Sequence, residues 1–139
     1  MKKTKLLIDY EYDFELFGIA SSAKFFKLAW AINSLLSTKL VKLDDYTIDY
    51  DKEEPVNYLN YCHEDDSCII QLFKNKSPDF ENKYILPEMT HFDFVIKING
   101  SFQTFAAEEV IKELREVKYI EYIAPIALEK LKSKDNFLN

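Results

Sequence analysis

The chain has 139 residues, which is enough for one domain whose core needs neither a disulfide nor a metal to hold it. Hydrophobic residues make up 47% of it and aromatic residues 15%, so the composition excludes a wholly disordered protein. The formal net charge of −6 and the single arginine, Arg115, argue against a nucleic-acid-binding protein, because arginine is the side chain best suited to clamp phosphates and to read guanine.

The N-terminal segment is basic but does not have the pattern of a signal peptide. Only Leu6, Leu7 and Ile8 separate the lysine-rich residues 2–5 from Asp9, whereas signal peptides carry an apolar core of about 7–15 residues. The other apolar runs are also shorter than the ~18 residues of a membrane-spanning helix. We therefore expect a cytoplasmic protein that binds no membrane.

Hydrophobic periodicity predicts several strands and one long helix in the first half of the chain. Period-two alternation is typical of a half-buried strand, and apolar residues at i, i+3, i+4 and i+7 are typical of an amphipathic helix. Ser21 and Ser22 precede the helix and can cap it. The predicted elements are a strand at 4–18, a helix from this cap to about Thr38, a strand at 40–50 interrupted at its aspartates, and strands at 56–63 and 68–74 joined by a hairpin turn at 64–67.

The second half predicts a loop, a central strand, a helix and a last strand. Thr104 can cap the helix, and Pro125 is expected to stop the strand that follows it. The predicted elements are a surface loop at 75–84, a strand at 92–98, a helix at 105–117, a strand at 118–124, and a short helix at 127–134 before a frayed end at about 135–139.

The resulting order, β-α-β-ββ-β-α-β, sets two strand–helix–strand units on either side of a hairpin. No linker, repeat or low-complexity segment divides them. We predict a single α+β domain over residues 1–139, with a mixed β-sheet and two main helices packed on one face.

Two large aromatic residues lie off the apolar face of the first predicted helix. Phe26 and Trp30 are one i,i+4 step apart, beside Lys27 and Ser34. We expect a loop to cover them, because large aromatic side chains are usually buried. The alternative is that they form a contact surface for a partner.

Cys62 and Cys68 flank the predicted hairpin turn, and the length of its loop decides what they face. A two-residue loop pairs His63 with Cys68, and an odd-numbered loop pairs Cys62 with Cys68. A stable disulfide is not expected in a reducing compartment. Two cysteines and two histidines without a Cys-x-x-Cys pair do not predict a zinc site, and a cysteine nucleophile would need a histidine base such as His63.

The scarcity of glycine bears on cofactors. The chain contains Gly18 and Gly100 only, whereas a phosphate-binding loop needs several glycines so that backbone N–H groups can approach the anion. We therefore predict no nucleotide cofactor and, from the shortage of ligands, no metal.

Two carboxylates flank the start of the most hydrophobic predicted strand. Pro87 restricts Leu86 to an extended backbone, and Glu88 and Asp93 can accept hydrogen bonds from exposed backbone N–H groups in that turn. That structural role accounts for the pattern. The functional alternative is that Glu88, His91 and Asp93 converge in a pocket and perform acid–base chemistry or bind a small ligand.

One motif reads Leu86-Pro87-Glu88, three residues, then Phe92-Asp93-Phe94. It resembles the signature of the IPExxxVDY family of small proteins from Bacteroidota, with leucine, phenylalanine and phenylalanine in place of its isoleucine, valine and tyrosine. Three other segments are also similar to that family, so the resemblance covers most of the chain. They are the acidic segment 9–16, the Leu43-Asp44-Asp45 segment and the lysine-rich segment 131–134. It implies no activity, cofactor or catalytic residue, because the family has none assigned.

The sequence favours a non-enzymatic interaction or adaptor protein, because phosphate-binding and catalytic motifs are missing beside an ample aromatic core. We expect a protein partner or self-association as a homodimer, through a sheet edge or through the flank of Phe26 and Trp30. The alternative is a small-ligand-binding protein or an enzyme that uses the Glu88, His91 and Asp93 segment.

Overall fold

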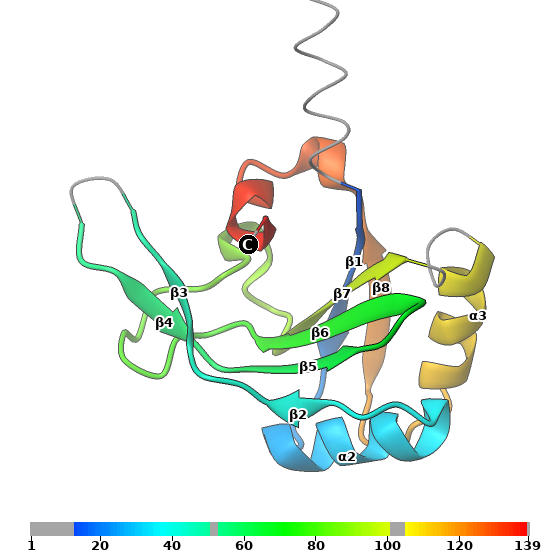
Figure 1. The fold of residues 1–139 in the computed structure, drawn as a ribbon. Coiled ribbons are helices and arrows are strands. Elements are labelled where there is room, and N and C mark those ends of the chain that lie inside the picture. Colours follow the sequence, from blue (N-terminus) through cyan, green and yellow to red (C-terminus); the bar gives the residue numbers. More distant parts are fainter. Residues whose placement is uncertain (1–12, 51–52, 101–104, 139) are drawn as a thin grey trace, which may run out of the picture.

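The centre of the fold is a six-stranded sheet. The computed structural model describes residues 13–50, 53–100 and 105–138 (Figure 1). Within these residues the strand order along the sheet is β2-β5-β6-β7-β1-β8, and β3 and β4 form a separate two-stranded sheet. The strands are β1 (Glu15–Ala20), β2 (Val41–Lys42), β3 (Tyr46–Ile48), β4 (Val56–Tyr58), β5 (Asn60–Glu64), β6 (Cys68–Lys74), β7 (Phe94–Gly100) and β8 (Tyr122–Ile126).

The described neighbours in the main sheet all pair antiparallel, whereas the sequence predicted a mixed sheet. Each helix does connect two strands that run in the same direction. However, β1 lies between β7 and β8, and three strands lie between β1 and β2. The predicted α+β class is therefore confirmed, but the strands joined by helices are never neighbours.

Both helices pack on one face of the sheet, as the sequence predicted. The helices are α2 (Phe25–Leu36) and α3 (Phe105–Leu114). Their buried residues join one core cluster with alternate residues of the central strands, and each large aliphatic side chain buried there contributes about 1.5–3 kcal/mol. The helical members are Leu28, Ala29, Ile32, Val110, Ile111 and Leu114, and the strand members include Phe17, Ile19, Ile70, Leu72, Phe94, Ile96 and Ile98.

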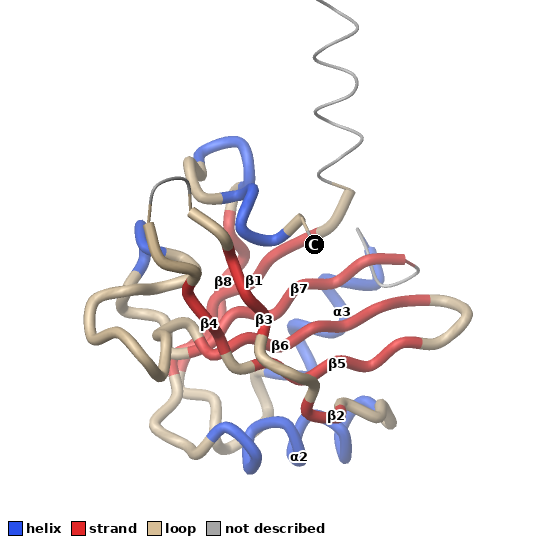
Figure 2. Tube along the Cα trace, turned by 60° about the vertical axis from the view of Figure 1, so that its left-hand side comes forward, coloured by secondary structure: helices blue, strands red, loops and turns tan. Residues whose placement is uncertain are grey.

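The opposite face is covered by a small sheet and by irregular segments rather than by α-helices (Figure 2). These are the β3–β4 pair and three 3-10 turns, η1 (Pro87–Met89), η2 (Leu128–Lys130) and η3 (Lys134–Phe137). Phe137 is fully buried, and its ring lies 5.6 Å from that of Phe73. The sequence predicted a short helix at 127–134 and a frayed end from 135. Both differ from the structure, because Phe137 fills the hydrophobic core on this face of the sheet, the second core.

Helix α2 begins later than predicted and is not capped by a serine. Its N-cap is Lys24, without a side-chain capping hydrogen bond, and the left-handed Ser37 (φ 57°) follows its last residue. Ser21 Oγ instead donates to the Tyr119 carbonyl, and Ser22 Oγ donates to Glu121 Oε2 (3.0 Å). The serines therefore tie α2 to the segment before β8. The predicted cap Thr104 lies outside the described residues, as does residue range 4–12 of the first predicted strand.

Several predicted strands have different boundaries because the chain crosses between sheets. The stretch 40–50 splits into β2 and β3, and 56–63 splits into β4 and β5. The buried Asn60 fixes the position of the chain between β2 and β3, because its Nδ2 donates to the Asp44 carbonyl oxygen (3.0 Å). Pro125 lies inside β8 rather than ending it, because an edge strand tolerates a residue that cannot donate a ladder hydrogen bond.

A lysine is buried under the second core. Lys97 has 7% of its surface exposed, donates from Nζ to the Phe137 carbonyl, and places Nζ 4.7 Å from the centre of the Phe14 ring. Burial lowers the pKa of Lys97, because the charged form loses its hydration. The carbonyl and the ring stabilise this ammonium, and in doing so they hold the C-terminal segment against the sheet.

Raising the pH should stabilise the wild type relative to a Lys97→Met variant. Because the pKa of Lys97 is lower in the fold than in the unfolded chain, the unfolded chain binds more protons in the interval between the two values. The free energy of unfolding should therefore rise with pH up to the ordinary lysine pKa of about 10.4. Urea denaturation at several pH values measures this, with the exposed Lys130→Met as control. A wild-type-to-variant difference that is constant with pH would contradict the prediction.

Candidate functional site

The Leu86-Pro87-Glu88 segment is held in place by one buried amide, that of Asn75. Asn75 Oδ1 accepts from the Leu86 backbone N–H (2.8 Å), and Nδ2 donates to the carbonyls of Met89 (3.2 Å) and Phe92 (2.9 Å). Its backbone also pairs with Ile85 and Asp93. Leu86 is thereby fixed in the core, fully buried, just before Pro87 opens η1.

Sequence reasoning missed Asn75 because it assigned residues 75–84 to a surface loop. Asn75 and Ser77 are buried, and Ser77 Oγ donates to the Asn57 carbonyl (2.8 Å). The remaining residues of that segment are exposed or partly exposed. An asparagine directly after a strand is an ordinary turn signal, so no local pattern distinguishes this amide from a solvated one.

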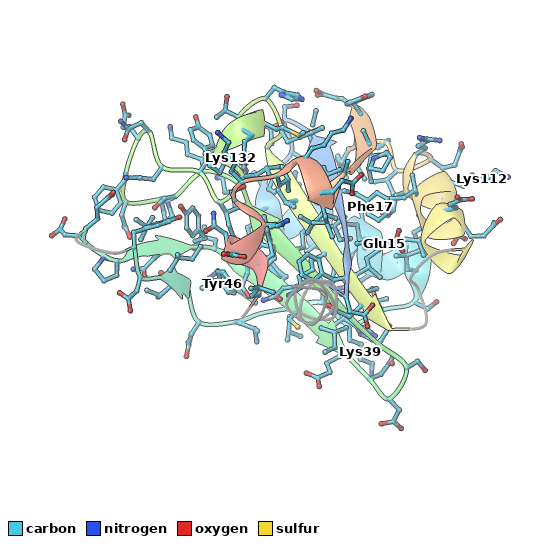
Figure 3. The ribbon with its side chains drawn as sticks, turned by 90° about the horizontal axis from the view of Figure 1, so that it is seen from above. Glu15, Phe17, Lys39, Tyr46, Lys112 and Lys132 are labelled. Carbon is cyan, nitrogen blue, oxygen red and sulfur yellow. The ribbon has the colours of Figure 1, made fainter. Side chains whose placement is uncertain are left out.

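Glu88 binds the C-terminal segment. One carboxylate oxygen, Oε2, accepts from the backbone N–H groups of Lys132 (2.6 Å) and Ser133 (3.0 Å), and Oε1 accepts from Ser133 Oγ (2.5 Å). Partial burial acts to raise the pKa of Glu88, but these hydrogen bonds together hold it below its ordinary value. Lys132 and Tyr46 lie on this side of the molecule (Figure 3), where the Tyr46 hydroxyl donates to the Asn136 carbonyl (2.5 Å).

Asp93 binds a different segment, the turn between β1 and α2. Its Oδ2 accepts from the Ser21 backbone N–H (2.8 Å), and its own backbone N–H donates to the Ile19 carbonyl (2.9 Å). The two carboxylates of the motif therefore accept hydrogen bonds from the main chain of two segments that are far apart in the sequence. The sequence predicted that they accept hydrogen bonds from N–H groups of their own turn. The acceptor role is therefore confirmed, but the donors are different from those predicted.

The structure does not bring Glu88, His91 and Asp93 together. The His91 side chain is exposed, and its ring lies 4.3 Å from that of Phe92. Among the described contacts, the partners of Glu88 and Asp93 are main-chain and hydroxyl groups, and neither carboxylate bonds to the imidazole. The acid–base alternative therefore lacks the hydrogen-bonded geometry that it requires.

A hollow of about 310 Å³ lies beside Asp93 but includes neither Glu88 nor His91. Two lysines and several hydroxyl groups line it, at the turn that leads into α2. The polar residues around it are Ser21, Ser22, Lys74, Lys76, Tyr84, Thr90 and Asp93. The Asp93 carboxylate is already engaged by Ser21, so the hollow offers mainly ammonium and hydroxyl groups.

His63, Asp65 and Cys68 form a second cluster, at the tip of the β5–β6 hairpin. Their ligand atoms lie within 4.8 Å of one another. However, His63 Nδ1 accepts from the Lys39 backbone N–H (3.0 Å), so its proton is on Nε2, which contacts Asp65 Oδ2 at 2.8 Å. Neither nitrogen has a free lone pair directed at a metal or at the thiol, and burial, followed by the nearby Asp65 charge, raises the pKa of Cys68.

The hairpin has a register that neither loop alternative anticipated. Glu64 pairs with Ile69 and His63 with Ile70, which leaves residues 65–67 between the two strands. The reason is Asp65, whose Oδ1 accepts from the backbone N–H groups of Ser67 (2.7 Å) and Cys68 (3.0 Å). These hydrogen bonds lower the pKa of Asp65. Both cysteines are free thiols.

Phe26 and Trp30 are exposed, so the expectation that a loop covers them is wrong. Trp30 has 67% and Phe26 56% of its surface exposed. Among the described segments, none covers these two side chains on the outer side of α2. The alternative, a contact surface, is the arrangement that agrees with this exposure.

A shallow groove of about 600 Å³ continues from Trp30 toward the end of α3. One wall is the outer side of α2, and the other is the segment between α3 and β8. Its lining residues are Trp30, Ala31, Ser34, Leu35, Val117, Lys118 and Tyr119. We name Phe26, Trp30 and this groove the α2 surface.

No family model and no curated protein matches the chain. Neither α2 nor α3 has the length and hydrophobicity that crossing a bilayer requires.

Replacing Asn75 with alanine should destabilise the fold by about 3 kcal/mol or more. The change leaves the buried Leu86 N–H and the Met89 and Phe92 carbonyls without partners, and each buried unsatisfied group costs about 1–3 kcal/mol. Urea denaturation measures the loss. The exposed Asn82→Ala is the matched control, expected within about 0.5 kcal/mol of the wild type. Equal stability of the two variants would contradict the role of the amide.

Acid should release the C-terminal segment through protonation of Glu88. A carboxylate with a depressed pKa stabilises the fold above its unfolded-state pKa, and this stabilisation is lost as the pH falls through the folded value. The hydrogen-exchange protection factors of the Lys132 and Ser133 amides should therefore decrease when the pH drops below about 4.3, the ordinary pKa of glutamate. In Glu88→Gln they should be low already at neutral pH, while the exposed Glu129→Gln should behave as the wild type. Wild-type protection in Glu88→Gln would refute this assignment.

Proposed function

We propose that this protein is a non-enzymatic interaction protein that binds another protein chain through the α2 surface. The observation that carries the proposal is the exposure of Trp30 and Phe26, one helical turn apart, next to an apolar groove. Large aromatic residues that remain accessible beside a groove are the usual anchors of protein interfaces. The proposal also includes a cytoplasmic location and a relationship to the IPExxxVDY family.

The energetics of the helix support a role in binding. Burying an exposed tryptophan or phenylalanine in a partner removes apolar area worth about 1.5–3 kcal/mol for each side chain. The fold itself uses the other side of α2, where Leu28, Ala29 and Ile32 are buried. Phe26 and Trp30 therefore contribute little to the domain core, and their cost in exposed apolar surface is offset only when a partner covers them.

The alternative of an enzyme or small-ligand binder at Glu88, His91 and Asp93 is less well supported. The side chains of these three residues make contacts with different segments, and the two carboxylates already accept hydrogen bonds from the main chain. The sheet edges also offer less to a partner than α2 does. The β2 edge has two residues, and Pro125 interrupts the hydrogen-bonding edge of β8.

Trp30→Ala should weaken association at least tenfold, or about 1.4 kcal/mol, and leave the fold intact. Sedimentation velocity tests self-association, and capture from a lysate of the native cells tests a different partner. The matched control is Tyr122→Ala, another aromatic residue, 57% exposed, which stacks on Phe92 and thus lies away from the α2 surface. A partner retained by Trp30→Ala, or lost equally in Tyr122→Ala, would rule out this surface.

A further inference from the structure

Helix α2 and its flanking residues carry positive charge on a protein whose net charge is negative. The other wall of the groove, within residues 115–121, carries both signs, with Arg115 and Lys118 beside Glu116 and Glu121. Between Leu16 and Leu43 the chain contains four lysines and no acidic residue, although its formal net charge is −6. These lysines are Lys24, Lys27, Lys39 and Lys42. The remainder of the chain is correspondingly more acidic, so the charge of α2 and its flanks is opposite in sign to that of the molecule as a whole.

Two lysines stand directly beside the aromatic residues and the groove. Lys27 is three residues before Trp30 and so lies on the same side of the helix. Lys118 lines the groove, with its Nζ 5.5 Å from the centre of the Tyr119 ring. Neither Lys27 nor Lys118 takes part in an ion pair among the described residues.

The groove and its charge select among the classes of partner. A groove between α2 and residues 117–119 accepts a row of protruding side chains, whereas a bilayer surface needs an apolar ridge that inserts into it. A second copy of the chain would bring the same lysines together across a two-fold contact, which costs energy through like-charge repulsion. Acidic residues on a different chain would complement Lys27 and Lys118.

We propose that the α2 surface binds an amphipathic segment of another protein, in which large apolar side chains are flanked by aspartate or glutamate. The apolar side chains enter the groove beside Trp30, and the carboxylates lie over Lys27 and Lys118. This inference rests on the proposed function and adds the chemistry of the partner to it.

Selection from a phage-displayed library of random 16-residue peptides, against the full chain, tests the inference. The expected peptides carry several large apolar residues together with an excess of aspartate and glutamate. They should bind the Lys27→Glu/Lys118→Glu variant at least tenfold more weakly than the wild type. The control is Lys76→Glu/Lys130→Glu, which changes the net charge equally at exposed positions outside the α2 surface and should leave binding within twofold. Circular dichroism checks that each variant is folded.

The outcomes separate this inference from the proposed function. Peptides that require Trp30 but lack acidic residues and tolerate the double charge reversal would overturn the partner chemistry and leave the docking surface standing. Failure to select peptides that distinguish the wild type from Trp30→Ala would overturn both. Trp30-dependent binding to phosphatidylserine vesicles without such peptides would also overturn the inference, in favour of a lipid surface.

Discussion

The side-chain amide of Asn75 is the interaction on which the arrangement of this fold most depends. It lies fully buried directly after β6 and bonds to the main chain at Leu86, Met89 and Phe92. It thereby closes the loop between β6 and β7, places Leu86 in the second core and sets the start of β7. Buried main-chain groups that lack a ladder partner need such an acceptor and donor, because leaving them unpaired costs about 1–3 kcal/mol each.

Once that loop is fixed, its two carboxylates fasten other parts of the chain. Glu88 accepts hydrogen bonds from the backbone N–H groups of Lys132 and Ser133, and Asp93 accepts one from the backbone N–H of Ser21. Asp65 does the same within the hairpin turn. Apart from the β3–β4 pair, irregular segments cover the second face of the sheet, and their N–H groups have no regular partners. Carboxylates supply strong acceptors for them, which explains acidic residues beside a hydrophobic strand without assigning them a reaction.

Helix α2 differs from the rest of the described molecule in the side chains that its outer side exposes. Its inner side packs on the sheet, while Phe26 and Trp30 remain exposed and its neighbourhood is rich in lysine. Stability alone gives no reason for two large aromatic residues in water at this position. The carboxylates are satisfied within the fold, whereas these aromatic residues are not covered and remain accessible to a partner.

The sequence by itself determined the class of fold and much of its core. Period-two and helical patterns predicted β6 with its observed bounds, α2 and α3 within a few residues, and the packing of both helices on one face. These features depend on local propensity and on which side of an element is apolar, and both can be read from neighbouring residues. The role of Glu88 and Asp93 as hydrogen-bond acceptors was also predictable from residue type, but their distant donors were not.

Only the tertiary structure decided which segments meet. The strand order, the split of 40–50 and 56–63 between two sheets, the burial of Asn75 and Phe137, and the exposure of Trp30 depend on contacts between residues far apart in the chain. Burial depends on whether another segment arrives to cover a side chain, and the C-terminal segment covers the face opposite α2. For that reason the pattern around Trp30 looked the same for a buried and an exposed residue, and only the assembled fold distinguished them.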